Sequence, residues 1–276
     1  MSDTESSLFN VTSVPDGYRQ YLQPAIFDPW ARELLAFAPP ASGDVILDVA
    51  AGTGAVAHAA SHIAGPGGRV IASDISPLML AESRQERTDD RAAVESLQSP
   101  ADHLALPDGS VDVVYCQQGM QFVPDRHAVM TEILRVLRPG GVVGIAVWSN
   151  GTPPEPFDSY ARILRAHNIP EPYPSAYDTS AVTMSESEIE FLFRSTGYRE
   201  PTVLTVELPL VWPDPESAAF GITGSTYGPA VASLSRAEQE EVFASIVKEA
   251  SGEKPPAVMR AVLGWGVAGE ALRGDT

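Results

Sequence analysis

Three aspartates and a glycine turn stand where a small ligand could be held. The run VILDVAAGTGAVAHAA at 45–60 reads as a strand ending at Asp48, after which Gly52-Thr53-Gly54 turns directly into a helix. Glycines let a backbone approach a ligand closely, and the amides at a helix start donate hydrogen bonds. A second strand ends at Asp74, where a carboxylate can accept hydrogen bonds from a ribose diol. This pattern predicts a nucleoside-containing cofactor.

Two cofactor classes fit the glycine turn. As Gly52-x-Gly54-x-x-Ala57 it satisfies the dinucleotide fingerprint, which is a weak signal by itself. Asp48, just before the turn, would repel a pyrophosphate but could hold the ammonium of an amino-acid moiety. Asp102, after a third strand, could accept a hydrogen bond from an adenine amino group. These acids favour a cationic ligand, whereas the alternative without a ligand is that each acid only caps a helix or turn.

The elements that must position these residues follow one another as repeated βαβ units. Short apolar β-type runs alternate with helical patterns, which indicates a parallel sheet with helices around it. The predicted strands are 44–50, 69–74, 93–98, 111–116 and 141–148, and the predicted helices are 54–64, 77–89 and 124–137. Open α/β sheets bind ligands at the carboxyl ends of their strands, so the three aspartates should meet at one edge.

The flanking regions differ from this core. Aromatic and aliphatic residues over 15–39 have helical spacing, whereas ten of the twenty-four prolines fall within 151–215 and favour loops. Further on, the patterns predict helices at 185–195 and 235–250, the first with a Ser185/Glu188 capping box, and strands at 202–211 and 257–267. The predicted domains are an N-terminal helical cap at 1–40, a cofactor-binding core at 41–150 and, at 151–276, the rest of the sheet with elaborations that cover the substrate.

Composition excludes several functions. The 276 residues carry 18 basic and 36 acidic side chains, a net charge of −18, and two lysines, so a phosphate-binding patch is not expected. Cys116 has no partner for a disulfide, and no apolar run is long enough to span a bilayer. The start lacks the features of a signal peptide, so a cytoplasmic location is expected. His58 and His62 have metal-ligand spacing but no third ligand, so no metal is predicted.

At the residues named above, the sequence resembles the class I S-adenosylmethionine-dependent methyltransferases, particularly the small-molecule branch of quinone biosynthesis and secondary metabolism. The resemblance covers about 18–148. Five elements carry it, in order: LDVAAGTG at 47–54, Asp74 followed by ISPLML, Ala101-Asp102 before LPDGSVDVV, QQGMQFVPD at 117–125 and RVLRPGG at 135–141. Ala50 departs from the pattern, because the family usually has its first loop glycine there.

The resemblance implies an α/β fold, a Rossmann-like doubly wound sheet of seven strands in the order 3-2-1-4-5-7-6 with the last strand antiparallel. Strands six and seven would be 202–211 and 257–267, with an insertion at 212–256 near the substrate. The implied cofactor is S-adenosyl-L-methionine, with S-adenosyl-L-homocysteine as product. The implied cofactor-binding residues are Asp48, Ala50, Gly52, Gly54, Asp74, Ile75, Met79, Asp102, His103 and Gln117.

Methyl transfer from a sulfonium is an in-line displacement, so an enzyme must mainly align the nucleophile and exclude water, and a general base is optional. Candidate catalytic residues are His127, His167 and Tyr18. Candidate substrate-binding residues, from the ends of the fourth and fifth strands and from possible covers, are Tyr18, Tyr21, Gln118, Gln121, Phe122, Trp148 and Tyr227. Selectivity is expected to reside in 15–30, 149–183 and 212–256.

Two other functions remain open on the sequence. A nicotinamide-dependent oxidoreductase would use the same glycine turn, but Asp48 disfavours it and a Tyr-x-x-x-Lys motif is absent. A protein with the same fold that binds its ligand, or catalyses a cyclisation, without transferring a methyl group also fits. The predicted partner is a small-molecule acceptor, with no nucleic acid and no membrane, and a homodimer is an option.

Overall fold

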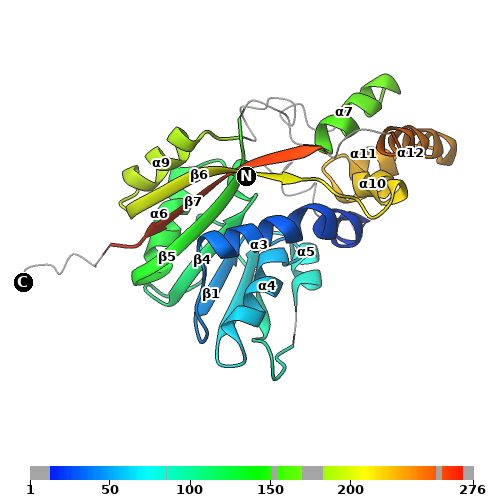
Figure 1. Cartoon of the computed structure of the whole chain (residues 1–276). Coiled ribbons are helices and arrows are strands. Elements are labelled where there is room, and N and C mark those ends of the chain that lie inside the picture. Colours follow the sequence, from blue (N-terminus) through cyan, green and yellow to red (C-terminus); the bar gives the residue numbers. More distant parts are fainter. Residues whose placement is uncertain (1–12, 85, 151–154, 170–182, 253–256, 270–276) are drawn as a thin grey trace, which may run out of the picture.

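One mixed sheet of seven strands forms the centre of the molecule (Figure 1). The computed structural model describes residues 13–84, 86–150, 155–169, 183–252 and 257–269. The strand order is β3-β2-β1-β4-β5-β7-β6, and β7 runs antiparallel to both of its neighbours. The predicted order and the antiparallel last strand are therefore confirmed.

The strands begin and end close to the predicted positions. They are β1 (Val45–Val49), β2 (Arg69–Asp74), β3 (Val94–Gln98), β4 (Val111–Gln117), β5 (Leu137–Trp148), β6 (Arg199–Pro209) and β7 (Val258–Val267). β5 starts four residues earlier than the predicted 141, because Leu137 already pairs with Val111 before an irregularity in the register. β5 then continues past this irregularity, and Gly140 within it has a left-handed φ of +81°.

Helices cover both faces of the sheet and create an apolar core on each. The helices α3 (Asp28–Phe37), α4 (Ala55–Ala64) and α5 (Pro77–Ser83) contact one another or β1–β3 on one side, whereas α6 (Arg126–Val136) and α9 (Glu186–Ser195) lie on the other (Figure 1). The predicted Ser185/Glu188 capping box is present. The prediction of a helix to 89 was wrong, because Arg84 has extended backbone angles that end α5 at Ser83.

A third apolar cluster lies beyond the sheet. It is built by α7 (Phe157–Ala166), α10 (Pro215–Gly221), η4 (Ile222–Gly224), α11 (Gly228–Ala232) and α12 (Arg236–Ala250), and buries Tyr160 and Tyr227. The described part of the interval predicted as an insertion, 212–252, thus forms a small helical unit together with α7. Of the predicted elaboration at 149–183, residues 151–154 and 170–182 lie outside the described residues.

The chain before the sheet packs against this helical unit. α2 (Ser13–Gly17) leads into the π-helix η1 (Tyr18–Phe27), which contains Pro24. Gly17 and Gly224 bring η1 and η4 into backbone contact, since a Cβ on Gly224 would lie 2.2 Å from the Tyr18 amide nitrogen. Pro24 has no amide hydrogen, so it donates no backbone hydrogen bond within this helix. Among the described residues, no helix is both long and apolar enough to cross a membrane.

Candidate functional site

A cavity of about 610 Å³ opens at the carboxyl ends of β1, β2, β4 and β5. This size is typical of a small-molecule site. Its described walls include seven of the predicted cofactor-binding residues, Ala50, Gly52, Asp74, Ile75, Met79, Asp102 and Gln117. They also include six of the predicted substrate-binding residues, Tyr18, Gln118, Gln121, Phe122, Trp148 and Tyr227. One cavity therefore brings together most of both predicted sets.

The turn after β1 has a left-handed backbone at three positions. Gly52 and Gly54 have φ values of +54° and +91°, and Ala50 has +55°. A Cβ on Gly52 would meet no atom within 4 Å, so this glycine faces open space and is needed for its backbone conformation. Ala50 adopts a conformation that costs an L-residue roughly 1–2 kcal/mol. At the position where the family usually has glycine, Ala50 thus takes up a left-handed conformation itself.

Two aspartates hold this turn through backbone amides. The Asp48 carboxylate accepts a hydrogen bond from the amide of Ala57, 3.0 Å away, in the first turn of α4. Asp74 accepts hydrogen bonds from the amides of Gly52 (2.9 Å) and Ser76 (2.8 Å). The two acids therefore fix the loop that follows β1 and the start of α5.

Burial shifts these two acids towards their protonated, neutral form. Desolvation raises the pKa of Asp48 to about 8, and the hydrogen bond from Ala57 only partly opposes it. Burial also raises the pKa of Asp74, against the hydrogen bonds that it accepts. A positive charge placed beside either acid would favour its ionised form.

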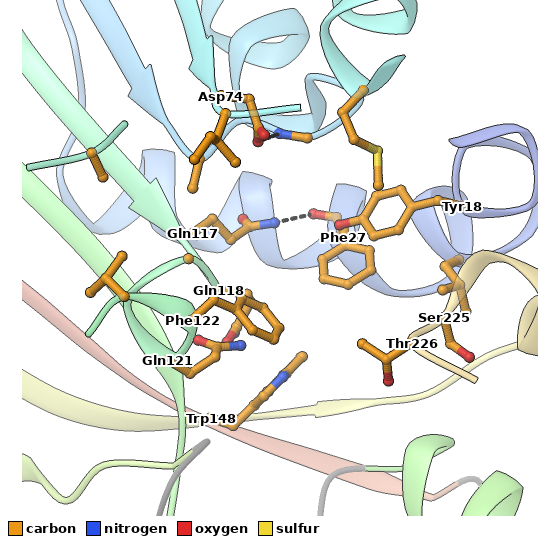
Figure 2. Close-up of a pocket in the computed structure, with 18 of the residues that line it drawn as sticks. Tyr18, Phe27, Asp74, Gln117, Gln118, Gln121, Phe122, Trp148, Ser225 and Thr226 are labelled. Atoms are coloured by element: carbon orange, nitrogen blue, oxygen red, sulfur yellow. Dashed lines mark hydrogen bonds between the residues drawn. The ribbon is translucent and has the colours of Figure 1, made fainter. Parts of the chain in front are cut away.

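The π-helix η1 is tied to the cofactor side of the cavity. The Gln117 side-chain amide donates to the Phe27 carbonyl, 3.0 Å away (Figure 2). The Thr53 hydroxyl, in the glycine turn, donates to Gln23, whose own amide donates to Asp28. Sequence reasoning missed Gln23, and no motif around it could have indicated this role. Thus a helix remote in sequence braces the glycine turn.

The opposite side of the cavity carries uncharged polar and aromatic groups. Figure 2 shows Gln118, Gln121, Phe122 and Trp148 gathered there. Gln118 is 5% exposed, yet neither its Oε1 nor its Nε2 has a hydrogen-bond partner, and Gln121 Oε1 is likewise buried and unpaired. Buried polar atoms are normally paired, so these unpaired atoms mark a place for a ligand.

Tyr18, the first residue of η1, also lines the cavity. Its ring stacks on Phe27 at a centroid distance of 4.6 Å (Figure 2). Burial raises the pKa of Tyr18 well above its ordinary value, and the nearby carboxylates of Asp74 and Asp48 raise it further. The hydroxyl therefore stays protonated near neutral pH and can donate a hydrogen bond.

Several predicted residues do not line the cavity. Asp48 and Gly54 lie behind its wall, where they support the turn, and His103 is exposed beside Asp102. Tyr21 points away and stacks on Phe220. Further lining residues were not named from the sequence but lie in the three segments predicted to carry selectivity; they include Leu22, Phe27, Phe157, Asp158, Arg165, Ser225 and Thr226.

The histidines lie elsewhere. His127 is exposed at the start of α6, with its Nε2 3.4 Å from the Ser195 carbonyl. His167 ends α7 and contacts Ser245. On α4, the His58 Nε2 contacts the Ser83 carbonyl oxygen. The His62 Nδ1 lies 3.9 Å from the Asp90 Oδ2. No histidine is therefore found among the described residues around the cavity.

This sheet order, with a glycine turn after β1 and an acid ending β2, is the architecture of the class I S-adenosylmethionine-dependent methyltransferases, and it confirms the resemblance seen in the sequence. The family model "Methyltransferase domain" matches residues 47–145, so this part of the chain resembles a methyltransferase domain. The match spans β1 to most of β5.

Known relatives agree with this assignment. The chain is similar to the ubiquinone/menaquinone biosynthesis C-methyltransferase of Pseudomonas putida, with 35% identity over 125 residues, 45% of this chain and 49% of the relative. The chain thus spans about half the length of this curated relative. The demethylmenaquinone methyltransferase of Lactobacillus johnsonii is 29% identical over 191 residues, covering 65% and 78% of the two chains.

A solved structure shares the fold. It is phosphoethanolamine N-methyltransferase 2 of Haemonchus contortus, in complex with phosphomonomethylethanolamine and S-adenosylhomocysteine. Its TM-score is 0.52 at 19% identity, and the match covers 86% of this chain and 51% of that one. At this identity, the match speaks for the arrangement of the elements alone.

Proposed function

We propose that the chain transfers a methyl group from S-adenosyl-L-methionine to a small-molecule acceptor and releases S-adenosyl-L-homocysteine. The observation that carries this proposal is the shared cavity. Acids and a glycine turn stand on one side of it, and carboxamides and aromatic rings on the other. The named activities of the two curated relatives, both methyl transfers, support the same reaction.

The cofactor side suits an S-adenosyl group in shape and in charge. Gly52 leaves room for close approach, Asp74 retains carboxylate lone pairs for a ribose diol, and a cation bound near the buried Asp48 would favour the ionised form of this acid. Ile75 and Met79 offer apolar contacts for a base, with Asp102 at its edge. The solved structure that shares this fold also holds S-adenosylhomocysteine.

When bound, S-adenosylmethionine supplies a methyl group already activated on a sulfonium. The chain then has to align the acceptor and exclude water, which are effects of proximity and desolvation. η1 and residues 224–227 form the cover for this task, because both line the cavity and touch each other through Gly17 and Gly224. The protonated Tyr18 hydroxyl serves as a donor rather than a base.

The expected partners stay predictions. A net charge of −18 and sparse lysines favour a small acceptor over nucleic acid. A homodimer and a cytoplasmic location also remain predictions from the sequence. Salt-sensitive binding of RNA or DNA near physiological ionic strength would contradict the first of them.

Calorimetry and product analysis test the proposal together. S-adenosylmethionine and S-adenosylhomocysteine should bind the purified chain, and NADH should not. With a panel of uncharged acceptors, S-adenosylhomocysteine should form in equal amounts with a methylated product, measured by mass spectrometry. Binding of NADH alone would favour an oxidoreductase. Binding of S-adenosylmethionine with a new product that lacks the methyl group would indicate a cyclisation.

A further inference from the structure

We propose that the acceptor is a flat, uncharged molecule that carries a hydrogen-bond acceptor next to a donor on one edge, as in a lactam or a hydroxy-carbonyl compound. Gln118 and Gln121 would bind that edge. This inference rests on the proposed function, and it adds to it the chemical class of the acceptor and the residues that select it.

Gln118 is held in an unusual position at the end of β4. Its backbone amide donates to the Ala146 carbonyl of β5, 2.8 Å away, and its φ is +52°, a left-handed conformation. Its side chain is 5% exposed, and both carboxamide atoms lack partners. Leaving a buried polar group unpaired and straining a backbone both cost stability. Packing alone does not explain why the Gln118 carboxamide is buried without partners. A ligand that completes its hydrogen bonds does explain it.

Gln121 adds a second unpaired group on the same side. It belongs to η2 (Met120–Phe122), directly after the Gln118 turn, and its buried Oε1 has no partner. Figure 2 shows the side chains of both glutamines in the same part of the cavity, near Trp148. A carboxamide offers both a carbonyl oxygen and amide hydrogens. A complementary edge must therefore donate one hydrogen bond and accept another.

The neighbouring walls are aromatic. Phe122 and Trp148 lie beside the two glutamines, and Phe27 and Tyr18 lie across the cavity (Figure 2). The edge contact of Trp148 with the buried Trp30, at a centroid distance of 5.8 Å, fixes the orientation of its indole. Aromatic faces favour stacked or edge-on partners. These walls suit a planar acceptor.

The charges around the cavity disfavour an anionic acceptor. The described ionisable side chains in its wall, tyrosines aside, are those of Asp74, Asp102, Asp125, Asp158 and Arg165. Four acids against one guanidinium repel a carboxylate or phosphate. A cationic amine would suit the charge, but it would leave the carboxamide hydrogens of Gln118 without an acceptor. An uncharged edge that both donates and accepts fits both constraints.

Four bicyclic probes of similar size test this inference in protein saturated with S-adenosylhomocysteine. Quinolin-2(1H)-one carries the lactam edge, naphthalene carries none, and naphthalene-2-carboxylate and 2-naphthylmethylammonium are charged. Calorimetry should rank the lactam at least about tenfold tighter than each of the others, as expected for a ligand that completes buried hydrogen bonds. Equal affinity for naphthalene, or tighter binding of either ion, would overturn the inference.

Variants assign the preference to the glutamines. Gln118→Leu should lower lactam affinity about tenfold and leave that of naphthalene within about twofold. Gln121→Leu, at a residue with ordinary backbone angles, should also reduce the lactam preference, and exposed Gln20→Leu should not. An unchanged preference in both cavity variants would refute the assignment.

Titration of S-adenosylhomocysteine into each variant serves as the control for folding. Failure of this ligand to bind the wild-type chain would count against the proposed function. The ranking of the four probes, repeated without it, would still decide the inference about the acceptor edge.

Discussion

The two sides of the cavity satisfy their polar groups in opposite ways. On the cofactor side, the Asp74 carboxylate accepts two backbone hydrogen bonds and Asp48 accepts one. On the acceptor side, Gln118 has no partner for either carboxamide atom. The two acids on the cofactor side are thus held by the protein's own backbone, although Gln117 Oε1 is buried and unpaired there, whereas on the acceptor side both carboxamide atoms of Gln118 lack partners.

The two sides of the cavity also come from different segments of the sequence. The cofactor turn and its acids come from one continuous stretch, 48–76, in which the two carboxylates accept hydrogen bonds from near neighbours or an adjacent strand, while η1 braces the turn through Gln23. The acceptor side combines η1, the ends of β4 and β5, α7 and residues 224–227. A site whose acids are held mainly within one stretch depends less on distant parts of the chain. A site built from many depends on all of them.

The largest expected effect concerns Asp48. Its pKa is raised from about 3.8 in the unfolded chain to about 8 in the folded one, so the folded protein retains a proton that the unfolded chain releases. The contribution of Asp48 to the free energy of unfolding should therefore be greatest below pH 4. It should be lost as pH rises towards 8, and the loss is several kcal/mol as an upper bound. Urea unfolding at several pH values should show this slope in the wild type and not in Asp48→Asn.

A bound S-adenosyl ligand sharpens this test. Its ammonium should lower the pKa of Asp48, so binding near pH 7 should release a proton and reduce the pH slope of stability. Calorimetry in buffers of different ionisation enthalpy measures that release. An equal slope with and without ligand would mean that Asp48 does not face the cation.

The next effect is that of Asp74→Ala on the cofactor side. The loss of a charged hydrogen-bond acceptor should weaken S-adenosylhomocysteine binding by about 1.5–3 kcal/mol, because Asp74 also holds the Gly52 amide. Asp74→Asn keeps one acceptor oxygen and should lose less. Asp108→Ala, outside the cavity, serves as the control. Unchanged affinity in calorimetry would remove Asp74 from the cofactor site.

The smallest effect on cofactor affinity is expected from Gly224→Ala, which acts on the acceptor side. The added Cβ would lie 2.2 Å from the Tyr18 amide nitrogen and would push η1 away from η4. Stability should fall by about 1–3 kcal/mol, and lactam affinity and methyl transfer should fall with it. S-adenosylhomocysteine affinity should stay within about twofold of wild type.

Gly67→Ala provides the matched control for Gly224→Ala, since its Cβ would meet nothing within 4 Å. If Gly224→Ala weakened the cofactor as much as the probe, the two sides of the cavity would not be independent. Unimpaired methyl transfer in Gly224→Ala would show that the contact between η1 and η4 does not shape the acceptor side.

The sequence by itself determined the sheet and the cofactor side. Alternating apolar runs locate the strands, and the residues that follow a strand's carboxyl end must lie at one edge, so Asp74 and Gly52 could be placed without a structure. These relationships are local or follow from strand order. Strand and helix ends were less certain, as the early end of α5 at Ser83 shows.

Only the tertiary structure decided which side chains face the acceptor. Tyr18 and Tyr21 have the same residue type and sit on one helix, yet Tyr18 faces the cavity and Tyr21 stacks on Phe220. Helical spacing cannot predict this, because the π turn of η1 changes which residues share a face and the contact with η4 sets the helix orientation. Tyr227 lines the cavity as predicted, yet most of its side chain packs among α7 and the helices of the insertion. Orientation of this kind comes from packing between segments far apart in the chain, which no local pattern records.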